Sequence, residues 1–402
     1  MHMLRAPAAA LILATTLGAQ TPPPAGMIRD AAVRRFALVV KADGSVVGWG
    51  NNQDGNAGEA GPGGGIVRTP IAIPLPGKAR QVALGLTAQY ALLEDGTVVA
   101  WGLNADGQLG NGPLGASGEM GRYPKPSASP VRVTGLSDII QIDAGSRHAL
   151  ALRGDGTVWA WGQRDNGAIG DGEAKTLRPT NAIGPVKVPG LEGITQIATY
   201  LNHNLALRRD GHVMAWGSNK DGELGLGTRT IGWTPAEVPG LDHIVAIDAG
   251  SAADHGVSGA VRDDGTVWLW GSGTAAIMGN GSSGAISPDD PGGRVLAPVA
   301  LKGITDAKRI ALGDGHAAAL LADGTLWMWG FNGTGQVGVG RAAGAYLKKP
   351  VRVTALANVS SLYLGSYNSF AVLKDGSFWI WGWDIPGGGM KNNYVPARMD
   401  LP

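Results

Sequence analysis

Cysteine is absent from the 402-residue sequence, which excludes disulfide bonds and thiolate metal sites. A dominant charge sign is also absent, since 33 lysines and arginines face 32 aspartates and glutamates, for a formal net charge of +1. Binding of polyanions needs clustered cations, so we expect no nucleic-acid partner. After the N-terminal segment, no apolar run is long enough to cross a bilayer, and we expect no membrane span.

Glycine, proline and tryptophan are abundant instead. The chain contains 66 glycines, 24 prolines and 13 tryptophans, and 44% of its residues are hydrophobic. Frequent turn formers suit either a low-complexity chain or an all-β fold with many turns. Because this apolar content can bury enough surface to fold, disorder is excluded and an all-β protein is favoured.

The N-terminus has the pattern of a secretory signal peptide. Arg5 precedes an apolar run over residues 8–17, and small residues follow up to Ala19. We predict a signal peptide over 1–19 and a Pro-rich linker over 20–26, and therefore a periplasmic or secreted protein. The alternative interpretation is a lipid-facing or disordered N-terminal tail.

A repeat dominates the remaining sequence. Each copy is an Asp-Gly pair followed, six residues after the Asp, by a Trp-Gly pair. Successive aspartates are 52 to 60 residues apart, so units of constant internal spacing are joined by variable loops. The seven pairs are Asp43/Trp49, Asp95/Trp101, Asp155/Trp161, Asp210/Trp216, Asp264/Trp270, Asp323/Trp329 and Asp375/Trp381.

Two strands flank each Asp-Gly pair. Between apolar runs this pair predicts a hairpin with a tight primed turn, because glycine adopts positive φ without cost. In the strand over 156–161, period-two alternation places Trp159 and Trp161 on one face. The position of Trp159 is large and apolar in every copy, so we expect this face to pack between neighbouring repeats.

Two further strands complete the unit. A stretch that ends in small residues, such as 142–145, precedes the hairpin and suits the crowded axis of a radial fold. A last strand is expected to begin at a proline, which cannot donate a ladder hydrogen bond and therefore places this strand on the rim. These prolines are Pro70, Pro130, Pro185, Pro235, Pro298, Pro350 and Pro396.

Seven units of four strands predict an all-β, seven-bladed β-propeller. An open solenoid would need distinct capping repeats, and none is visible. We expect one monomeric domain over 27–402, closed by pairing of the N- and C-terminal strands in one blade. The predicted repeats are 27–77, 78–135, 136–190, 191–240, 241–300, 301–355 and 356–402.

The unit resembles the regulator of chromosome condensation repeat over essentially the whole chain after residue 27. The third copy carries the motif as Gly145, His148, Ala151-Leu152, Asp155-Gly156 and Trp161-Gly162. The resemblance implies a seven-bladed propeller. Its founding member is a nuclear exchange factor for the small GTPase Ran that also docks on nucleosomes. Other members are bacterial secreted or surface proteins, one of which inhibits β-lactamases, and we expect a bacterial, exported member here.

Two departures from the family bear on function. Exchange activity in the founding type relies on a wedge-like insertion, and no segment of this sequence matches it. The family histidine is replaced in four copies, by Phe36, Ala88, Val257 and Asn368. We therefore predict a structural role, with hydrogen bonds within the blade, for the histidines that remain, His148, His203 and His316.

Catalytic constellations are not found in the sequence. No histidine pair has the spacing of a helical zinc motif. The loops at 104–107 and 219–222 faintly resemble calcium loops but lack the later bidentate glutamate. We expect no enzyme activity, no cofactor and no metal.

Binding through loops is the function class that remains, because a rigid scaffold commonly positions recognition residues on loops. We predict an exported, non-catalytic scaffold that binds a protein through one propeller face. The alternatives are a guanine-nucleotide exchange factor by family analogy, or a carbohydrate-binding envelope module that stacks sugars on Trp233 or Trp383. The candidate residues, which could equally just cover loop bases, are Arg68, Arg122, Tyr123, Arg178, Trp233, Tyr346 and Trp383.

Overall fold

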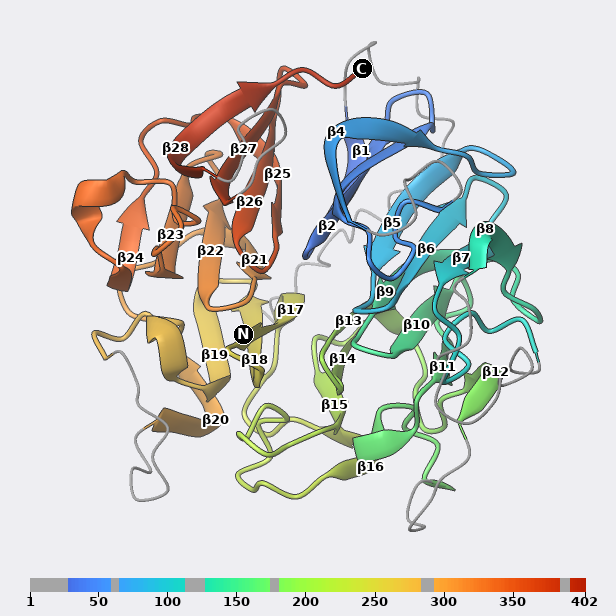
Figure 1. Ribbon diagram of the computed structural model, residues 1–402. Coiled ribbons are helices and arrows are strands. Elements are labelled where there is room, and N and C mark those ends of the chain that lie inside the picture. Colours follow the sequence, from blue (N-terminus) through green and yellow to red (C-terminus); the bar gives the residue numbers. More distant parts are fainter. Residues whose placement is uncertain (1–27, 59–64, 113–126, 174–180, 283–292, 384–390) are drawn as a thin grey trace, which may run out of the picture.

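Seven antiparallel sheets of four strands radiate from one axis in the computed structural model (Figure 1). The structure describes residues 28–58, 65–112, 127–173, 181–282, 293–383 and 391–402. Each sheet consists of four strands that follow one another in the sequence, with the first strand innermost. The predicted all-β, seven-bladed propeller is confirmed.

The strands of blades 1 to 4 are β1 (Ile28–Val33), β2 (Phe36–Lys41), β3 (Val46–Asn51) and β4 (Ile66–Ile73); β5 (Ala79–Leu84), β6 (Ala88–Leu93), β7 (Val98–Gly102) and β8 (Ser127–Arg132); β9 (Ile139–Ala144), β10 (His148–Arg153), β11 (Val158–Gly162) and β12 (Ala182–Lys187); β13 (Ile194–Tyr200), β14 (His203–Arg208), β15 (Val213–Gly217) and β16 (Gly232–Glu237).

The strands of blades 5 to 7 are β17 (Ile244–Ala252), β18 (His255–Arg262), β19 (Val267–Ser272) and β20 (Arg294–Ala300); β21 (Ala307–Leu312), β22 (His316–Leu321), β23 (Leu326–Phe331) and β24 (Tyr346–Arg352); β25 (Val359–Leu364), β26 (Asn368–Leu373), β27 (Phe378–Trp383) and β28 (Asn392–Met399). Short 3-10 turns occur at η2 (Asp165–Gly167), η4 (Thr274–Ala276) and η6 (Arg341–Ala343).

The closure of the ring differs from the prediction. The N- and C-terminal strands, β1 and β28, belong to different blades, and no described strand is shared between blades 1 and 7. Side chains join these blades instead, through one core cluster that includes Val33, Phe36, Phe370 and Phe378. Each blade already holds four strands from its own repeat, so the ring closes by packing and needs no exchanged strand.

The Asp-Gly hairpins also differ in turn type. In blade 1 only Gly44 has a positive φ, +83°, and the loop spans three residues between Lys41 and Ser45. This is the three-residue hairpin that carries a left-handed glycine, not the two-residue primed turn. The Asp43 carboxylate accepts hydrogen bonds from the backbone N–H and hydroxyl of Ser45 at 2.9 and 2.6 Å. These bonds fix the turn and lower the pKa of Asp43.

The seven repeat tryptophans are buried between blades, as predicted. Trp49 is 3% exposed. The other six are fully buried, namely Trp101, Trp161, Trp216, Trp270, Trp329 and Trp381. Trp161 donates its indole N–H to the backbone oxygen of Gln108 in the preceding blade at 2.8 Å, and Trp270 donates likewise to Glu223 at 2.9 Å. The glycine after each tryptophan is required: a Cβ on Gly102, at φ +103°, would lie 2.6 Å from the Thr87 oxygen.

The outer strands begin before their prolines, contrary to the prediction. In blade 4, Ala215 pairs with Ala236 and Gly217 pairs with Gly232, so the ladder is interrupted between these pairs. Pro235 lies in this irregular stretch, and the prolines of the other six blades do the same. A proline placed there breaks no ladder hydrogen bond, which lets the strand extend on both sides of it. The predicted position of these strands at the rim is confirmed.

The innermost strands are joined by side chains that complete their free edges. Gln141 of blade 3 donates to the Ile197 oxygen at 2.9 Å and accepts the Ile197 N–H at 3.0 Å in blade 4. Gln81 and Gln196 make the same reciprocal pair of bonds with the following blade. These amides replace the backbone partner that an edge strand lacks, so they bind the blades into a ring.

Two of the three family histidines, His148 and His316, act between blades rather than within them, which corrects the prediction for these two. His148 of blade 3 lies 2.7 Å from the Asn204 amide oxygen and 3.1 Å from the Thr199 hydroxyl, both in blade 4. His316 of blade 6 lies 2.9 Å from the Ser369 hydroxyl in blade 7. Burial lowers the pKa of His148 to about 4 and that of His316 to about 3, so both side chains are neutral near pH 7.

Candidate functional site

The propeller has two faces of different character. The turn face carries the Asp-Gly hairpins, which repeat nearly the same sequence seven times. Their carboxylates are occupied locally, as Asp155 is by Thr157 and Asp323 is by Thr325. The loop face carries the hairpins between first and second strands and the connections between third and fourth strands. Its residues differ from blade to blade, which is what a specific binding surface needs.

Six of the seven repeat tryptophans are fully buried and offer no surface to a ligand on either face. Trp101, Trp329 and Trp381 are fully buried, and each donates its indole N–H to a backbone oxygen of the preceding blade. Trp101 donates to the Asn56 oxygen at 2.9 Å, Trp329 to the Ile277 oxygen at 2.6 Å, and Trp381 to the Gln336 oxygen at 2.8 Å. These side chains hold neighbouring blades together, so the recurring Trp-Gly motif is structural and the binding site must be sought elsewhere.

The hairpins at the centre of the loop face are bonded to one another through their backbones. The Leu86 N–H donates to the Ser146 oxygen at 3.0 Å, and the Ser146 N–H donates to the Leu201 oxygen at 2.7 Å. On the other side, Ser251 N–H donates to Gly313 oxygen at 3.0 Å and Asp314 N–H to Gly365 oxygen at 3.1 Å. The mouth of the propeller is therefore a preorganised rim.

An arginine crosses this mouth. The Arg34 guanidinium of blade 1 lies 4.1 Å from the ring centroid of Tyr200 in blade 4, and Arg34 donates to the Ala144 oxygen of blade 3 at 3.0 Å. Arg34, Leu84 and Tyr200 line both the hollow above them and the channel below. They divide the axis into an axial bowl of ≈ 110 Å³ on the loop face and an axial channel of ≈ 250 Å³ beneath it.

The axial bowl presents exposed groups of both charges and apolar side chains. Arg35 and Asp254 are exposed on its rim, Leu86 is 44% exposed, and Asp54 and Asp314 are half-buried in its wall. Burial raises the pKa of Asp54, and the nearby charge of Arg35 opposes that shift. This mixture of charged rim and apolar surface suits a protein more than a small apolar ligand.

Three carboxylates line the axial channel and bridge neighbouring blades. Asp30 accepts the Val82 N–H at 2.9 Å, Asp143 accepts the Thr199 N–H at 2.8 Å, and Asp248 accepts the Leu312 N–H at 2.7 Å. Burial raises their pKa values to about 7, 6 and 8 respectively. The hydrogen bonds work against these shifts, and Arg34 also lowers the pKa of Asp143.

Blade 5 contributes a longer central hairpin than its neighbours. Ala252 pairs with His255 across a two-residue turn in which Ala253 and Asp254 both have positive φ, +53° and +66°. His255 at its base lies 2.8 Å from the buried Asp221 carboxylate, which Arg294 also contacts at 2.9 Å. These contacts tie blade 5 to blade 4, and the one from His255 holds the base of the hairpin that carries Asp254 beside the axial bowl.

The predicted site residues do not form one cluster. Arg68 is exposed on β4, Trp233 is half-buried on β16, and Tyr346 is 49% exposed on β24. Tyr346 packs on Phe331 with centroids 5.3 Å apart. Trp383 alone lies near the central hairpins, where its ring meets that of Tyr367 at 5.8 Å and 79°. Arg122, Tyr123 and Arg178 lie outside the described residues.

The central hairpins were missed by the sequence argument, which followed loop length. Arg34, Arg35, Tyr200 and Asp314 lie in or beside connections of only two or three residues. The available signal was chemical: these connections hold charged or aromatic residues in some copies and small residues in others, whereas the flanking strands repeat.

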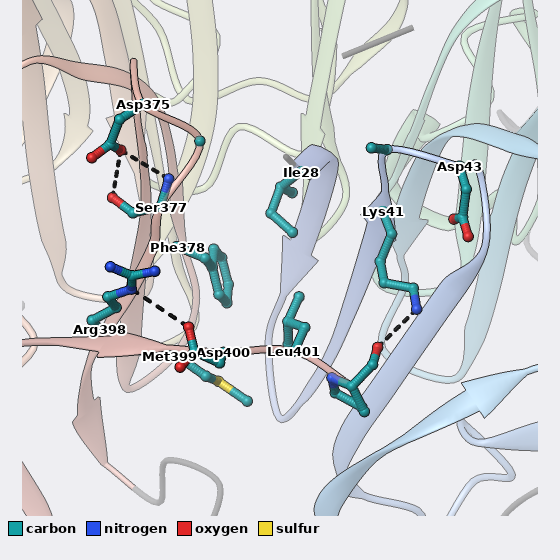
Figure 2. Close-up of a pocket in the computed structure, with 13 residues that line it drawn as sticks. Ile28, Lys41, Asp43, Asp375, Ser377, Phe378, Arg398, Met399, Asp400 and Leu401 are labelled. Atoms are coloured by element: carbon teal, nitrogen blue, oxygen red, sulfur yellow. Dashed lines mark hydrogen bonds and ion pairs between the residues drawn. The ribbon is translucent and has the colours of Figure 1, made fainter. Parts of the chain in front are cut away.

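A pocket of ≈ 480 Å³ opens on the turn face where blades 1 and 7 meet (Figure 2). Ile28, Phe378 and Leu401 supply its apolar wall, and Figure 2 shows Lys41 and Arg398 on opposite sides of it. Lys41 donates to the Pro402 oxygen at 2.8 Å, and Arg398 lies 3.5 Å from Asp400. Both cations are thus held by neighbours in this pocket.

Metal and membrane sites can be assessed for the described residues. Within those ranges no group of three or more His, Asp or Glu side chains could hold a metal ion. None of the helices found there is long and apolar enough to span a membrane.

Comparison with known families gives a consistent result. A family model described as the RCC1-like domain matches residues 16–298. Two models of the regulator of chromosome condensation (RCC1) repeat match residues 307–336 and 323–372.

Individual relatives cover most of the chain. The ultraviolet-B receptor UVR8 of Arabidopsis thaliana is 29% identical over 336 residues, which are 81% of this chain and 71% of the receptor. The guanine nucleotide exchange factor SRM1 of Saccharomyces cerevisiae is 28% identical over 338 residues, 73% of this chain and 66% of that protein. The E3 ubiquitin-protein ligase HERC2 of Mus musculus is 24% identical over 361 residues, but this chain spans only 7% of its length.

Solved structures show the same fold. The crystal structure of Prp20p from Saccharomyces cerevisiae, described with its binding properties to Gsp1p and histones, superposes with a TM-score of 0.72 at 22% identity. The match covers 93% of this chain and 87% of Prp20p.

Proposed function

Because this chain belongs to the RCC1-like domain family, we propose that it is a non-catalytic scaffold that binds a protein partner through its loop face. One observation carries this proposal: the central hairpins differ in sequence, and backbone bonds join those of blades 2 to 4 and those of blades 5 to 7 into a rigid mouth, such as Ser146 N–H to Leu201 oxygen at 2.7 Å. A preorganised surface loses little conformational freedom when a partner binds, so more of the contact energy appears as affinity.

Two further features support the loop face over the turn face. The loop face exposes Leu86 and Tyr367, to 44% and 37%, beside the exposed cation Arg35. Aromatic and arginine side chains are the commonest anchors of protein interfaces. On the turn face six of the seven repeated aspartates are instead satisfied by a serine or threonine two residues later, as Asp95 is by Thr97, and Asp210 is satisfied by Arg208 and the His212 N–H.

An exchange factor for a small GTPase is the second candidate. It is favoured by the match to the exchange factor SRM1, and by the structural likeness to Prp20p, which is described as binding Gsp1p. A catalytic amount of this protein should then accelerate release of a fluorescent guanine nucleotide from its GTPase. A scaffold without exchange activity would bind the GTPase, or another protein, and leave the release rate unchanged.

We assign this role to the periplasm or the exterior of the cell. The support is the residue pattern of positions 1–19, in which a cation precedes an apolar run and small residues. Expression of the full chain in a bacterium, followed by fractionation and N-terminal sequencing, tests the assignment. Export predicts a mature N-terminus near Gln20 in the periplasm or medium, whereas an intact Met1 in the cytoplasm would contradict it.

Partner capture tests the proposed face. The mature chain is immobilised and exposed to envelope and culture-supernatant fractions, and retained proteins are identified by mass spectrometry. Leu86→Glu is compared with Ile140→Glu, because both side chains are 44% exposed but Ile140 is the second residue of an innermost strand, at its turn-face end. We expect a protein that is retained by the parent and by Ile140→Glu and lost by Leu86→Glu. Loss with Ile140→Glu alone would move the site to the turn face.

A further inference from the structure

A cleft of ≈ 270 Å³ opens on the loop face where blade 7 meets blade 1. Its apolar wall is formed by Phe36, Trp49, Ile66 and Trp383. Arg34, Arg35, Phe36 and Asn51 line both this cleft and the axial bowl, so the two hollows adjoin. We call it the aromatic cleft.

The cleft exists because a bridge between blades is missing at this junction. In blades 3 and 6, a histidine at the start of the second strand reaches a polar side chain of the next blade, as His316 reaches Ser369 at 2.9 Å. Blade 7 has Asn368 at this position and blade 1 has Ala37 where Ser369 would be. Asn368 bonds instead to the Trp383 oxygen of its own blade at 2.9 Å. The space that an imidazole fills elsewhere is therefore open.

The aromatic side chains at the cleft are held in place. The rings of Trp383 and Tyr367 meet edge to face, 5.8 Å apart, and the backbone N–H of Trp383 donates to the backbone oxygen of Tyr367 at 2.9 Å. Tyr367 is 37% exposed and Trp383 is half-buried. Fixed rings with accessible surface favour an incoming ring in stacked or edge-to-face contact.

The polar groups at the cleft define the rest of the ligand. Arg35 is exposed, and within the described residues no carboxylate lies within ion-pair distance of it. The buried Asn368 amide oxygen has no hydrogen-bond partner there. A carboxylate would complement Arg35, and the N–H or O–H at the edge of an indole or phenol is the kind of donor that the Asn368 oxygen lacks.

We infer that the aromatic cleft receives a tryptophan or tyrosine side chain of the protein partner, with an adjacent aspartate or glutamate placed at Arg35. This inference rests on the proposed protein-binding function and names the anchor within it. A sugar ring fits less well, because it would bring several hydroxyls against a mainly apolar wall. Of the polar side chains there, Arg34 and Asn51 already make hydrogen bonds within the protein.

A defined peptide probe tests the inference on the full mature chain. Acetyl-Glu-Trp-amide is titrated by ligand-observed NMR, with acetyl-Gln-Trp-amide, acetyl-Glu-Ala-amide and methyl β-glucopyranoside as comparison ligands. We expect saturable binding of the Glu-Trp probe, at least about tenfold weaker binding of Glu-Ala, and no saturable binding of the glucoside. Saturable glucoside binding without peptide binding, or no saturable peptide binding, would overturn the inference.

Three variants locate the probe. Asn368→His should fill the cleft, as the histidines of blades 3 and 6 fill the corresponding space at their junctions. Tyr367→Ala removes one wall of the cleft. Each variant should bind the Glu-Trp probe about tenfold or more weakly than the parent. Arg35→Gln should abolish the preference for Glu-Trp over Gln-Trp. Tyr346→Ala, an exposed aromatic on the same face, should leave binding unchanged. An unchanged affinity in Asn368→His would refute the cleft as the site.

The same variants separate this inference from the proposed function. Asn368→His should fold with an unchanged or higher melting temperature, since histidine occupies this position in three other blades. If Asn368→His retains the captured partner while Leu86→Glu loses it, the cleft is not the anchor but the loop face still binds. If every loop-face variant retains the partner, the proposed function itself is wrong.

Discussion

The indole of Trp49 stacks on the ring of Phe370, with centroids 5.7 Å apart and planes inclined by 27°. Trp49 belongs to the first blade and Phe370 to the seventh, so this contact lies in the junction that closes the ring. Both rings are buried in one cluster with residues from both blades. The closing junction is therefore stabilised mainly by apolar packing.

Truncation of Phe370 should destabilise the whole propeller. We expect Phe370→Ala to lower the free energy of unfolding by about 3–5 kcal/mol, the range for a buried phenylalanine, because a cavity opens in the closing junction. Phe370→Leu should cost less, since it keeps most of the volume. Urea unfolding monitored by tryptophan fluorescence gives both values. Equal losses for the two variants would show that packing at Phe370 is not what holds the junction.

The indole hydrogen bonds between blades can be isolated with a matched pair. Trp329 and Trp216 are both fully buried, but Trp329 donates its indole N–H to the Ile277 oxygen while the Trp216 indole N–H has no partner in the described structure. The backbone oxygen of Ala168, which lies in the position of the tryptophan acceptor at this junction, accepts a hydrogen bond from the Asn204 amide at 3.0 Å instead. Replacement by phenylalanine should therefore cost about 1–3 kcal/mol more at Trp329 than at Trp216, because only the first leaves a carbonyl unpaired. Chemical unfolding of both variants measures this difference. A larger loss of unfolding free energy at Trp216 would contradict the assigned role of the indole hydrogen bond.

The reciprocal amide bonds along the axis should be visible in hydrogen exchange. Gln141→Ala removes both bonds to the Ile197 backbone. We expect faster exchange of the Ile197 amide and a loss of about 1–3 kcal/mol in unfolding free energy. Gln53→Ala, at an exposed glutamine, serves as the control. Unchanged protection of Ile197 would mean that the amide does not complete the strand edge.

The channel carboxylates should make stability depend on pH. Burial raises the pKa of Asp248 to about 8, of Asp30 to about 7 and of Asp143 to about 6. An unfolded aspartate titrates near 3.9, so between about pH 4 and pH 8 the folded state holds more protons than the unfolded state. Stability should therefore fall as the pH rises through this window.

Asp248→Asn isolates one of these groups. Its amide oxygen can still accept the Leu312 N–H, but it no longer ionises. We expect a flatter dependence of unfolding free energy on pH between 5 and 8, by at most about 1.4 kcal/mol per pH unit. Asp323→Asn on the turn face, where hydrogen bonds from Thr325 lower the carboxyl pKa, should leave the slope between pH 5 and 8 unchanged. A steeper slope in Asp248→Asn would reverse the sign of the argument.

The fold was predictable because its constraints recur in every repeat. The Asp-Gly to Trp-Gly spacing gave the blade number, and the alternation around Trp161 gave the face buried between blades. The loop-face site was not predictable in the same way. The aromatic cleft depends on Phe36, Ala37 and Asn368, which meet only because the first and last repeats become neighbours in the ring. The turn type and the outer-strand starts were missed because a glycine permits a positive φ and a proline fixes its own φ, but neither sets the length of the loop or strand around it.

Ring closure by packing has a consequence for folding. Each blade pairs strands that are consecutive in the sequence, so its ladders join segments of the same repeat at a modest cost in loop-closure entropy. The contacts of Trp49 with Phe370 and of Lys41 with Pro402 are different, since they join the two ends of the described chain. Their formation must wait until the intervening blades are in register, and the average sequence separation of contacts stays low until that step. An open arc of stacked blades, with its first and last blades apart, is thus the natural intermediate on the way to the closed ring.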